Sequence, residues 1–109
     1  MVKRAQEPSL FAARMKMARE RLGISQMELG VRAGIDEFSA SARINQYERS
    51  KHTPNFSTTC NLAQVLGIPA AYFYTEDENL ADLIIIFSKM KLAEQKTLSA
   101  FAESLINSP

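Results

Sequence analysis

The stretch SARINQYERSK, near the middle of the chain, gathers side chains that can donate and accept hydrogen bonds. Its apolar residues, Ile44 and Tyr47, are three positions apart, which places them on one side of a helix. Successive helical residues turn by about 100°, so Asn45, Gln46 and Arg49 lie on the other side. The stretch therefore predicts a helix that packs on a core by one side and presents polar groups on the other.

The polar side of this helix suits the edges of DNA base pairs. A carboxamide can donate and accept at once, as adenine requires, and a guanidinium suits guanine or phosphate. Small residues at the start of the stretch would let the backbone approach a groove closely. Because solvated helix sides are polar in many proteins, this pattern alone does not establish base recognition. The candidate base-reading residues are Ser41, Ala42, Arg43, Asn45 and Gln46.

Length and composition are those of one small globular domain with an appended element. The chain has 109 residues, of which 46% are hydrophobic and 23% charged. The apolar run at 83–87 is as long as any in the chain and is far too short to span a bilayer. The basic start of the chain has no apolar stretch behind it, unlike a signal peptide. Cys60 has no partner for an internal disulfide, so we expect a cytoplasmic protein.

Charge is divided unevenly along the chain. Residues 1–52 contain 10 Lys or Arg and 6 Asp or Glu, whereas residues 53–109 contain 3 and 6. The basic half indicates a polyanionic partner, although an excess of this size also arises by chance. The chain has a single His and no glycine-rich phosphate loop, paired Cys motif or acidic metal cluster. We therefore expect no metal, no cofactor and no enzymatic activity.

Helical signals run through the whole chain, and no stretch alternates convincingly as a strand would. Amphipathic spacing and capping signals predict helices at 10–22, 26–33, 40–49 and 58–66, a short one at 69–74, and two more after residue 77. Ser9 and Gly23 bound the first helix, and Ser25 with Glu28 forms a capping box for the second. Ser57 is expected to cap the fourth. We predict an all-α fold of five short helices followed by a two-helix extension.

The order of these signals forms a recognisable pattern, in which a capped short helix, a glycine, a turn and a second amphipathic helix make a helix-turn-helix. The matching motifs are Arg19-x-x-Leu22-Gly23, Ser25-Gln26-x-x-Leu29, Ala33-Gly34-Ile35, Ile44-x-x-Tyr47-Glu48-x-x-Lys51, Pro54 and Leu62-Ala63-x-x-Leu66-Gly67. On these motifs, residues 10–75 resemble the lambda-repressor-like, Cro/cI-type (XRE) family of DNA-binding regulators. We accordingly divide the chain into a flexible segment at 1–9, a helix-turn-helix DNA-binding domain at 10–75 and a helical extension at 76–109.

The resemblance implies that the helix after the turn lies in the DNA major groove and that its outward residues read bases. The outward residues concerned are the candidate base-reading residues named above, Ser41, Ala42, Arg43, Asn45 and Gln46. The resemblance also implies that Gln26 clamps a backbone phosphate and braces the reading helix; its place at a helix N-terminus independently favours anions. The other implied phosphate contacts are Arg49, Lys51 and Asn55, with Arg14 and Lys16 as weaker candidates.

Two further residues match a partly buried salt bridge of the family. Glu48 lies on the inward side of its helix, so it needs a charged partner there, and Arg19 occupies the matching position. We interpret the pair as scaffold and not as a catalytic acid and base.

The chain departs from the family pattern at three places. The segment DEFSAS is expected to lengthen the turn, with Phe38 either joining the core or making a separate contact. Gly30 replaces a common alanine and permits close packing. Ser50 replaces a common glycine, so we expect a left-handed backbone there.

The extension carries two apolar stripes, which exceed what two isolated helices can bury. They are Leu80, Leu83, Ile84 and Phe87, then Leu98, Phe101 and Leu105. Either the extension folds back on the first and fifth helices, or it pairs with a second chain. We favour a homodimer formed through residues 80–106, because paired modules read two-fold symmetric half-sites. The extension is too short for a typical ligand-sensing domain, so we expect no small-molecule effector.

The sequence thus favours a transcriptional regulator, more specifically a repressor, that binds double-stranded DNA as a homodimer. The alternative is a protein-interaction module with the same fold, such as an antitoxin or a coactivator-type subunit. That alternative predicts an apolar outward side on the helix at 40–49, whereas the observed side carries Asn, Gln and Arg.

Overall fold

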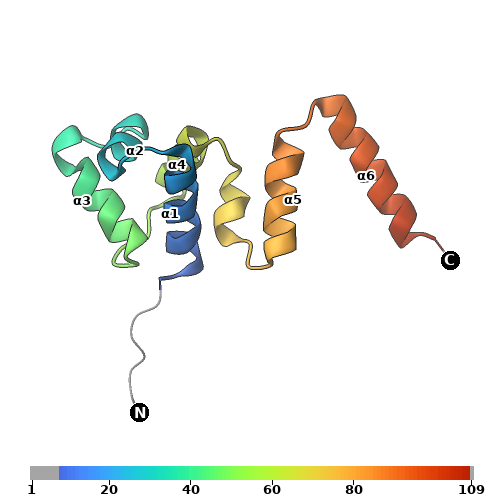
Figure 1. Ribbon diagram of the computed structural model, residues 1–109, viewed down its shortest axis with the longest axis horizontal. Coiled ribbons are helices and arrows are strands. Elements are labelled where there is room, and N and C mark those ends of the chain that lie inside the picture. The colour runs from blue at the N-terminus through green and yellow to red at the C-terminus, as the bar shows by residue number, and fades with distance from the viewer. Residues whose placement is uncertain (1–7, 109) are drawn as a thin grey trace, which may run out of the picture.

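The computed structural model describes residues 8–108 as a chain of helices (Figure 1). They are α1 (Leu10–Leu22), α2 (Gln26–Arg32), α3 (Glu37–Glu48), α4 (Phe56–Leu66), the 3-10 helix η1 (Ala70–Tyr74), α5 (Glu78–Ser88) and α6 (Leu92–Ile106). The predicted all-α class with a two-helix extension is confirmed. Most of the segment predicted to be flexible, residues 1–7 of 1–9, lies outside the described residues.

The core lies among α1, α2, α3, α4 and η1. Its large side chains include Phe11, Met15, Leu29, Ile44, Tyr47, Leu62, Leu66, Tyr72 and Phe73. The Phe11 and Phe73 rings lie with their centroids 4.8 Å apart, which joins α1 to η1. Aromatic burial of this kind dominates the packing of a small domain. The core therefore positions α3 through its inner side and leaves its outer side free for contacts.

The predicted ends of α1 are confirmed. Ser9 Oγ accepts a hydrogen bond from the Ala12 amide at 3.1 Å, and Gly23 has the left-handed φ of 75°. At the start of α2, Ser25 Oγ accepts from the Glu28 amide at 3.0 Å, which is half of the predicted capping box. The other half is wrong, because the Glu28 carboxylate turns along the helix to Arg32 instead.

The predicted start of the third helix is wrong by three residues. α3 begins at Glu37, and Asp36 caps it by accepting from the Phe38 amide at 3.0 Å. Asp at the cap and Glu in the first turn both favour a helix start, because their charge complements the unpaired amides. The extra residues of this segment thus lengthen the helix and not the turn. Phe38 is 91% exposed, so its placement in the core is excluded.

The fourth helix also starts earlier than predicted. Asn55 caps it by accepting from the Thr58 amide at 2.8 Å, and α4 begins at Phe56. Asn and Ser are about equally good caps, so local preference alone does not choose between Asn55 and Ser57.

Two backbone positions match the expectations drawn from the departures. A Cβ atom added to Gly30 would lie 2.7 Å from the Ala40 Cβ, so only glycine allows α2 and α3 to come this close. Ser50 has a φ of 60°, in the left-handed region. Its Oγ accepts from the Ser9 amide at 2.7 Å, which ties the end of α3 to the start of α1.

The two helices of the extension behave differently. α5 buries Ala81 and packs Ile84 and Ile85 against the core, so it folds back as one of the alternatives requires. α6 buries none of its residues within the described chain and projects from the far end of the molecule (Figure 1). The radius of gyration, 16.7 Å, accordingly exceeds the roughly 13 Å of a compact domain of about 100 residues. None of the described helices combines the length and apolarity that a bilayer crossing requires.

Candidate nucleic-acid interface

The outer side of α3 is accessible along its whole length. Ile44 is fully buried and anchors the helix, whereas Ser41, Ala42, Arg43 and Gln46 are exposed. Asn45 is half-buried because it borders the start of α2. Figure 1 places α3 at the opposite end of the molecule from α6. The five predicted base-reading residues therefore lie on the accessible part of α3, with Ala42, Asn45 and Gln46 on its outer side and Ser41 and Arg43 flanking them on opposite sides.

Gln26, the first residue of α2, holds this surface from one edge. Its Nε2 lies 3.3 Å from Asn45 Oδ1 and 3.0 Å from Glu48 Oε1. A side chain held by neighbours loses less conformational freedom when it binds a ligand. The arrangement thus orients Asn45 before any contact with DNA.

Arg19 and Glu48 form an ion pair beneath the same surface. Arg19 Nε lies 2.6 Å from Glu48 Oε2, and Arg19 Nη2 lies 3.1 Å from Glu48 Oε1, which makes the pair bidentate. Arg19 Nη1 also donates to the Ile24 carbonyl at 2.9 Å. The hydrogen bond to Glu48 raises the pKa of Arg19 above its ordinary value, although burial opposes the change. The pair joins α1, α3 and the turn before α2.

The predicted phosphate contacts lie around the ends of α3 and α4. Arg49 and Lys51 are exposed just beyond the last turn of α3. Asn55 is also exposed, but its Oδ1 already caps α4, so only its amide nitrogen is suited to an anion. Gln26 lies at the N-terminus of α2, with its side chain directed at Asn45 and Glu48.

Arg14, a weaker phosphate candidate, has a different role. Its side chain is 4% exposed and donates to the Thr75 carbonyl at 2.6 Å and the Glu76 carbonyl at 3.3 Å. It also binds Glu78 Oε2 at 3.1 Å, and this hydrogen bond raises the pKa of Arg14. The prediction of a phosphate contact is wrong because Arg14 fastens the extension to α1. Lys16, the other weak candidate, is exposed.

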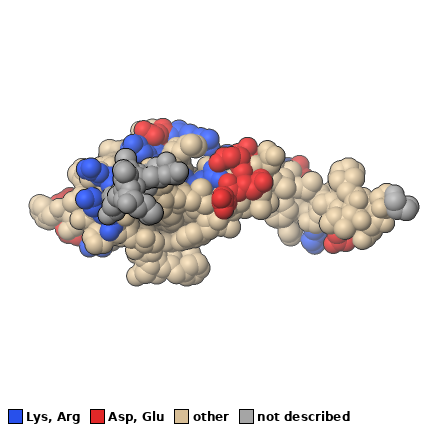
Figure 2. Space-filling model, turned by 90° about the horizontal axis from the view of Figure 1, so that it is seen from below, with Lys and Arg blue, Asp and Glu red and all other residues tan. Residues whose placement is uncertain are grey.

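Charged side chains are distributed unevenly on the face shown in Figure 2. Most of the Lys and Arg lie over the end formed by α1 to α4, with some Asp and Glu among them, and a larger group of Asp and Glu lies farther along, near the start of α5. Glu76, Asp77 and Glu78 supply exposed acidic residues there. The end that carries α3 is thus the one better suited to an anionic partner.

The structure adds one residue to this surface that the sequence did not place there. Phe38 lies in the first turn of α3, ahead of the five predicted residues. The signal was present, since Asp36 and Glu37 together favour a helix start, but the segment was interpreted as a turn.

Comparisons with known proteins agree with this geometry. Residues 10–72 match the family model of a helix-turn-helix domain. Among solved structures, the chain is similar to the crystal structure of transcriptional regulator BswR, with 48% sequence identity and a TM-score of 0.79. That likeness covers 85% of this chain and 92% of the other, so it reaches beyond residues 10–72. A search of curated proteins finds no match. The chain belongs to the helix-turn-helix domain family.

Proposed function

We propose that this protein is a sequence-specific DNA-binding transcriptional regulator of the Cro/cI (XRE) type, acting in the cytoplasm as a repressor and without enzymatic activity. The observation that carries the proposal is the outer side of α3, where Asn45 and Gln46 face outward from a helix anchored by Ile44. The helix enters the major groove and places these carboxamides against base edges. The likeness to a transcriptional regulator supports the same conclusion.

The roles of the other residues follow from their places around α3. Ser41, Ala42 and Arg43 complete the base-reading set from the exposed middle of the helix. The phosphate contacts come from the main-chain amide of Gln26 at the start of α2, from Arg49 and Lys51 just after α3, and from Asn55 at the start of α4. Phosphate contacts fix the register of the protein on the duplex, and base contacts supply the preference for a sequence.

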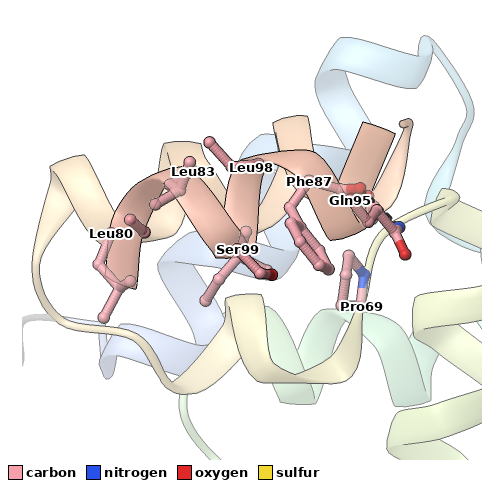
Figure 3. Close-up of a pocket in the computed structure, with 10 residues that line it drawn as sticks. Pro69, Leu80, Leu83, Phe87, Gln95, Leu98 and Ser99 are labelled. Carbon is pink, nitrogen blue, oxygen red and sulfur yellow. Dashed lines mark hydrogen bonds between the residues drawn. The ribbon is translucent and has the colours of Figure 1, made fainter. Parts of the chain in front are cut away.

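Binding as a homodimer completes the proposal. An apolar groove of 590 Å³ lies between α5 and α6, with Leu80, Leu83, Phe87 and Leu98 along its walls (Figure 3). Phe101 and Leu105 continue the apolar surface along α6 and are 59% and 64% exposed. A helix that leaves such a surface unburied is suited to pack against the extension of a second copy. The dimer then presents two α3 helices to two half-sites.

The alternative, a protein-interaction module such as an antitoxin, has one observation in its favour. Phe38 and Phe56 are 91% and 75% exposed, and aromatic residues are enriched at protein interfaces. The carboxamides on α3 favour DNA, because an interface core is depleted of groups that need polar partners.

The experiment that tests the proposal measures binding to genomic DNA fragments at two salt concentrations. Base reading predicts that a few fragments are preferred at both, whereas contact with phosphates alone predicts steep salt dependence without preference. Gln46→Ala is expected to reduce the preference by about 1–3 kcal/mol at one base pair. Gln64→Ala, at an exposed glutamine of α4, is the matched control and should behave as wild type. Uniform binding by the wild-type protein would contradict the proposal.

A further inference from the structure

Phe38 is the most exposed of the large apolar side chains in the described part of the chain. It is 91% exposed, whereas Phe11 and Phe73 are almost completely buried. Single exposed apolar residues are common on protein surfaces, so exposure alone gives Phe38 no role. Its position on α3 distinguishes Phe38 from the other exposed apolar residues.

The helical geometry places Phe38 in line with two of the five predicted base-reading residues, Ala42 and Asn45. Measured from the buried Ile44 at about 100° per residue, Phe38 lies at about 120°. Asn45 and Ala42 lie at about 100° and 160°, and Arg49 lies at about 140°. These four residues form one stripe, which runs from an apolar ring at the N-terminus of α3 to a cation just beyond its end. The stripe is about 16 Å long.

The acidic residues beside Phe38 lie off this stripe. Asp36 directs its Oδ2 back to the Phe38 amide at 3.0 Å and so serves as the helix cap. Glu37 lies at about 20° from Ile44 on the helical wheel, roughly one residue step away from Phe38. On this stripe, the apolar ring is the group nearest the N-terminus of α3.

Resting on the proposed function, we propose that Phe38 determines specificity by contacting the C5-methyl group of a thymine in the major groove. The thymine methyl is the apolar group on the major-groove edges of base pairs, and Phe is among the side chains that contact it. In helix-turn-helix proteins the N-terminal residues of the reading helix reach base edges. The extra residues before Ala40 thus extend the reading helix toward an additional base pair, at which thymine is preferred.

Substitution of thymine by uracil tests this proposal, because uracil lacks only the methyl group. Once the preferred DNA fragment has been identified, each of its thymines is replaced by uracil, one at a time. Binding to each fragment is then measured for wild type, Phe38→Ala, Phe38→Leu and Phe56→Ala. The wild-type protein should lose affinity by roughly fourfold at one thymine, the value of one buried methyl group. Phe38→Ala should lose this sensitivity and no other, and Phe38→Leu should keep part of it. Phe56→Ala, which removes an exposed aromatic residue of α4, should retain it.

Three results would overturn the proposal. The first is a preferred site at which no uracil weakens binding, and the second is equal uracil sensitivity in wild type and Phe38→Ala. The third is a Phe38→Ala protein whose DNA binding is unchanged while its self-association or protein binding is lost, which would assign Phe38 to a protein partner. All three leave sequence-specific DNA binding intact, whereas the absence of any preferred fragment would reject the proposed function together with this inference. Unchanged thermal unfolding of the variants confirms that the fold is preserved.

Discussion

Gln26 donates from Nε2 to Glu48 Oε1 across 3.0 Å, so the first residue of α2 is joined to the last residue of α3. The same nitrogen lies 3.3 Å from Asn45 Oδ1. Because Glu48 also binds Arg19, one polar network runs from the interior of the molecule to the outer side of α3. A change within this network should therefore alter both stability and the orientation of Asn45.

Gln26→Ala separates these two effects. We expect a loss of about 1 kcal/mol in the free energy of unfolding, because Glu48 keeps its bidentate partner. Affinity for the preferred fragment should fall and discrimination at the base pair read by Asn45 should weaken, because Gln26 no longer orients the Asn45 side chain. Fluorescence anisotropy with the preferred fragment and its single-base variants measures both. Discrimination equal to that of wild type would contradict the bracing role of Gln26.

Gly30 provides a test of the distance between α2 and α3. A Cβ atom at Gly30 would lie 2.7 Å from the Ala40 Cβ, so Gly30→Ala must push the helices apart. Overpacking of this kind costs about 1–3 kcal/mol, which outweighs a gain of about 1 kcal/mol in helix propensity at most sites. We expect a lower urea midpoint with an unchanged denaturant slope, and weaker DNA binding because α3 is displaced.

The matched control for Gly30→Ala is the double variant with Ala40→Gly. Removal of the Ala40 Cβ relieves the closest approach, although the Ala40 Cα and carbonyl oxygen remain 3.0 and 3.1 Å from the new methyl group. The urea midpoint should recover in part after allowance for the cost of glycine at position 40, about 1 kcal/mol. No recovery beyond the sum of the single effects would show that the two residues are not coupled.

Arg14 is expected to control how firmly α5 is attached. Arg14→Ala removes donors to the Thr75 and Glu76 carbonyls as well as the contact with Glu78, so we expect a loss of about 2–3 kcal/mol in the free energy of unfolding. Glu78→Gln is the control, because that carboxylate is 77% exposed and its charge contributes at most about 1 kcal/mol. Hydrogen exchange of the α5 amides should accelerate in Arg14→Ala alone. Equal effects of the two variants would mean that the carbonyl contacts contribute little.

The features that the sequence predicted correctly depend on signals close together in the chain. Ser9 and Gly23 bound α1 by local capping, and the three-residue spacing of Ile44 and Tyr47 identifies the buried side of α3. The predicted start of α4 was wrong because two acceptable caps, Asn55 and Ser57, compete within a few residues and tertiary packing selects between them. The predicted start of α3 was wrong because the segment before Ala40 was interpreted as a turn. Asn55 directly precedes the first turn of α4, which begins at Phe56, whereas Ser57 lies within that turn.

Contacts between residues far apart in the chain could not be predicted from local sequence patterns. Arg14 lies 61 residues before Thr75, and nothing in the spacing of either segment indicates that they meet. A basic residue on the first helix fits a phosphate contact equally well until the path of the chain is known. The sequence left Phe38 open between the core and a separate contact, because residue type alone does not decide whether an apolar residue in a presumed loop is buried.

We expect the homodimer to form through the apolar stripe of α6, and substitutions at two adjacent residues test this expectation. Phe101 is 59% exposed, so Phe101→Glu should preserve the fold of the single chain while placing a charge within the stripe. Sedimentation velocity should change from a dimer to a monomer, and affinity for a two-half-site DNA fragment should fall by roughly 100-fold or more as the second site loses its effective concentration. Ala100→Glu introduces the same side chain about 100° away on the helix, outside the stripe, and should remain dimeric. A wild-type protein that sediments as a monomer at micromolar concentration, or two variants with the same sedimentation coefficient as wild type, would show that α6 does not form the dimer.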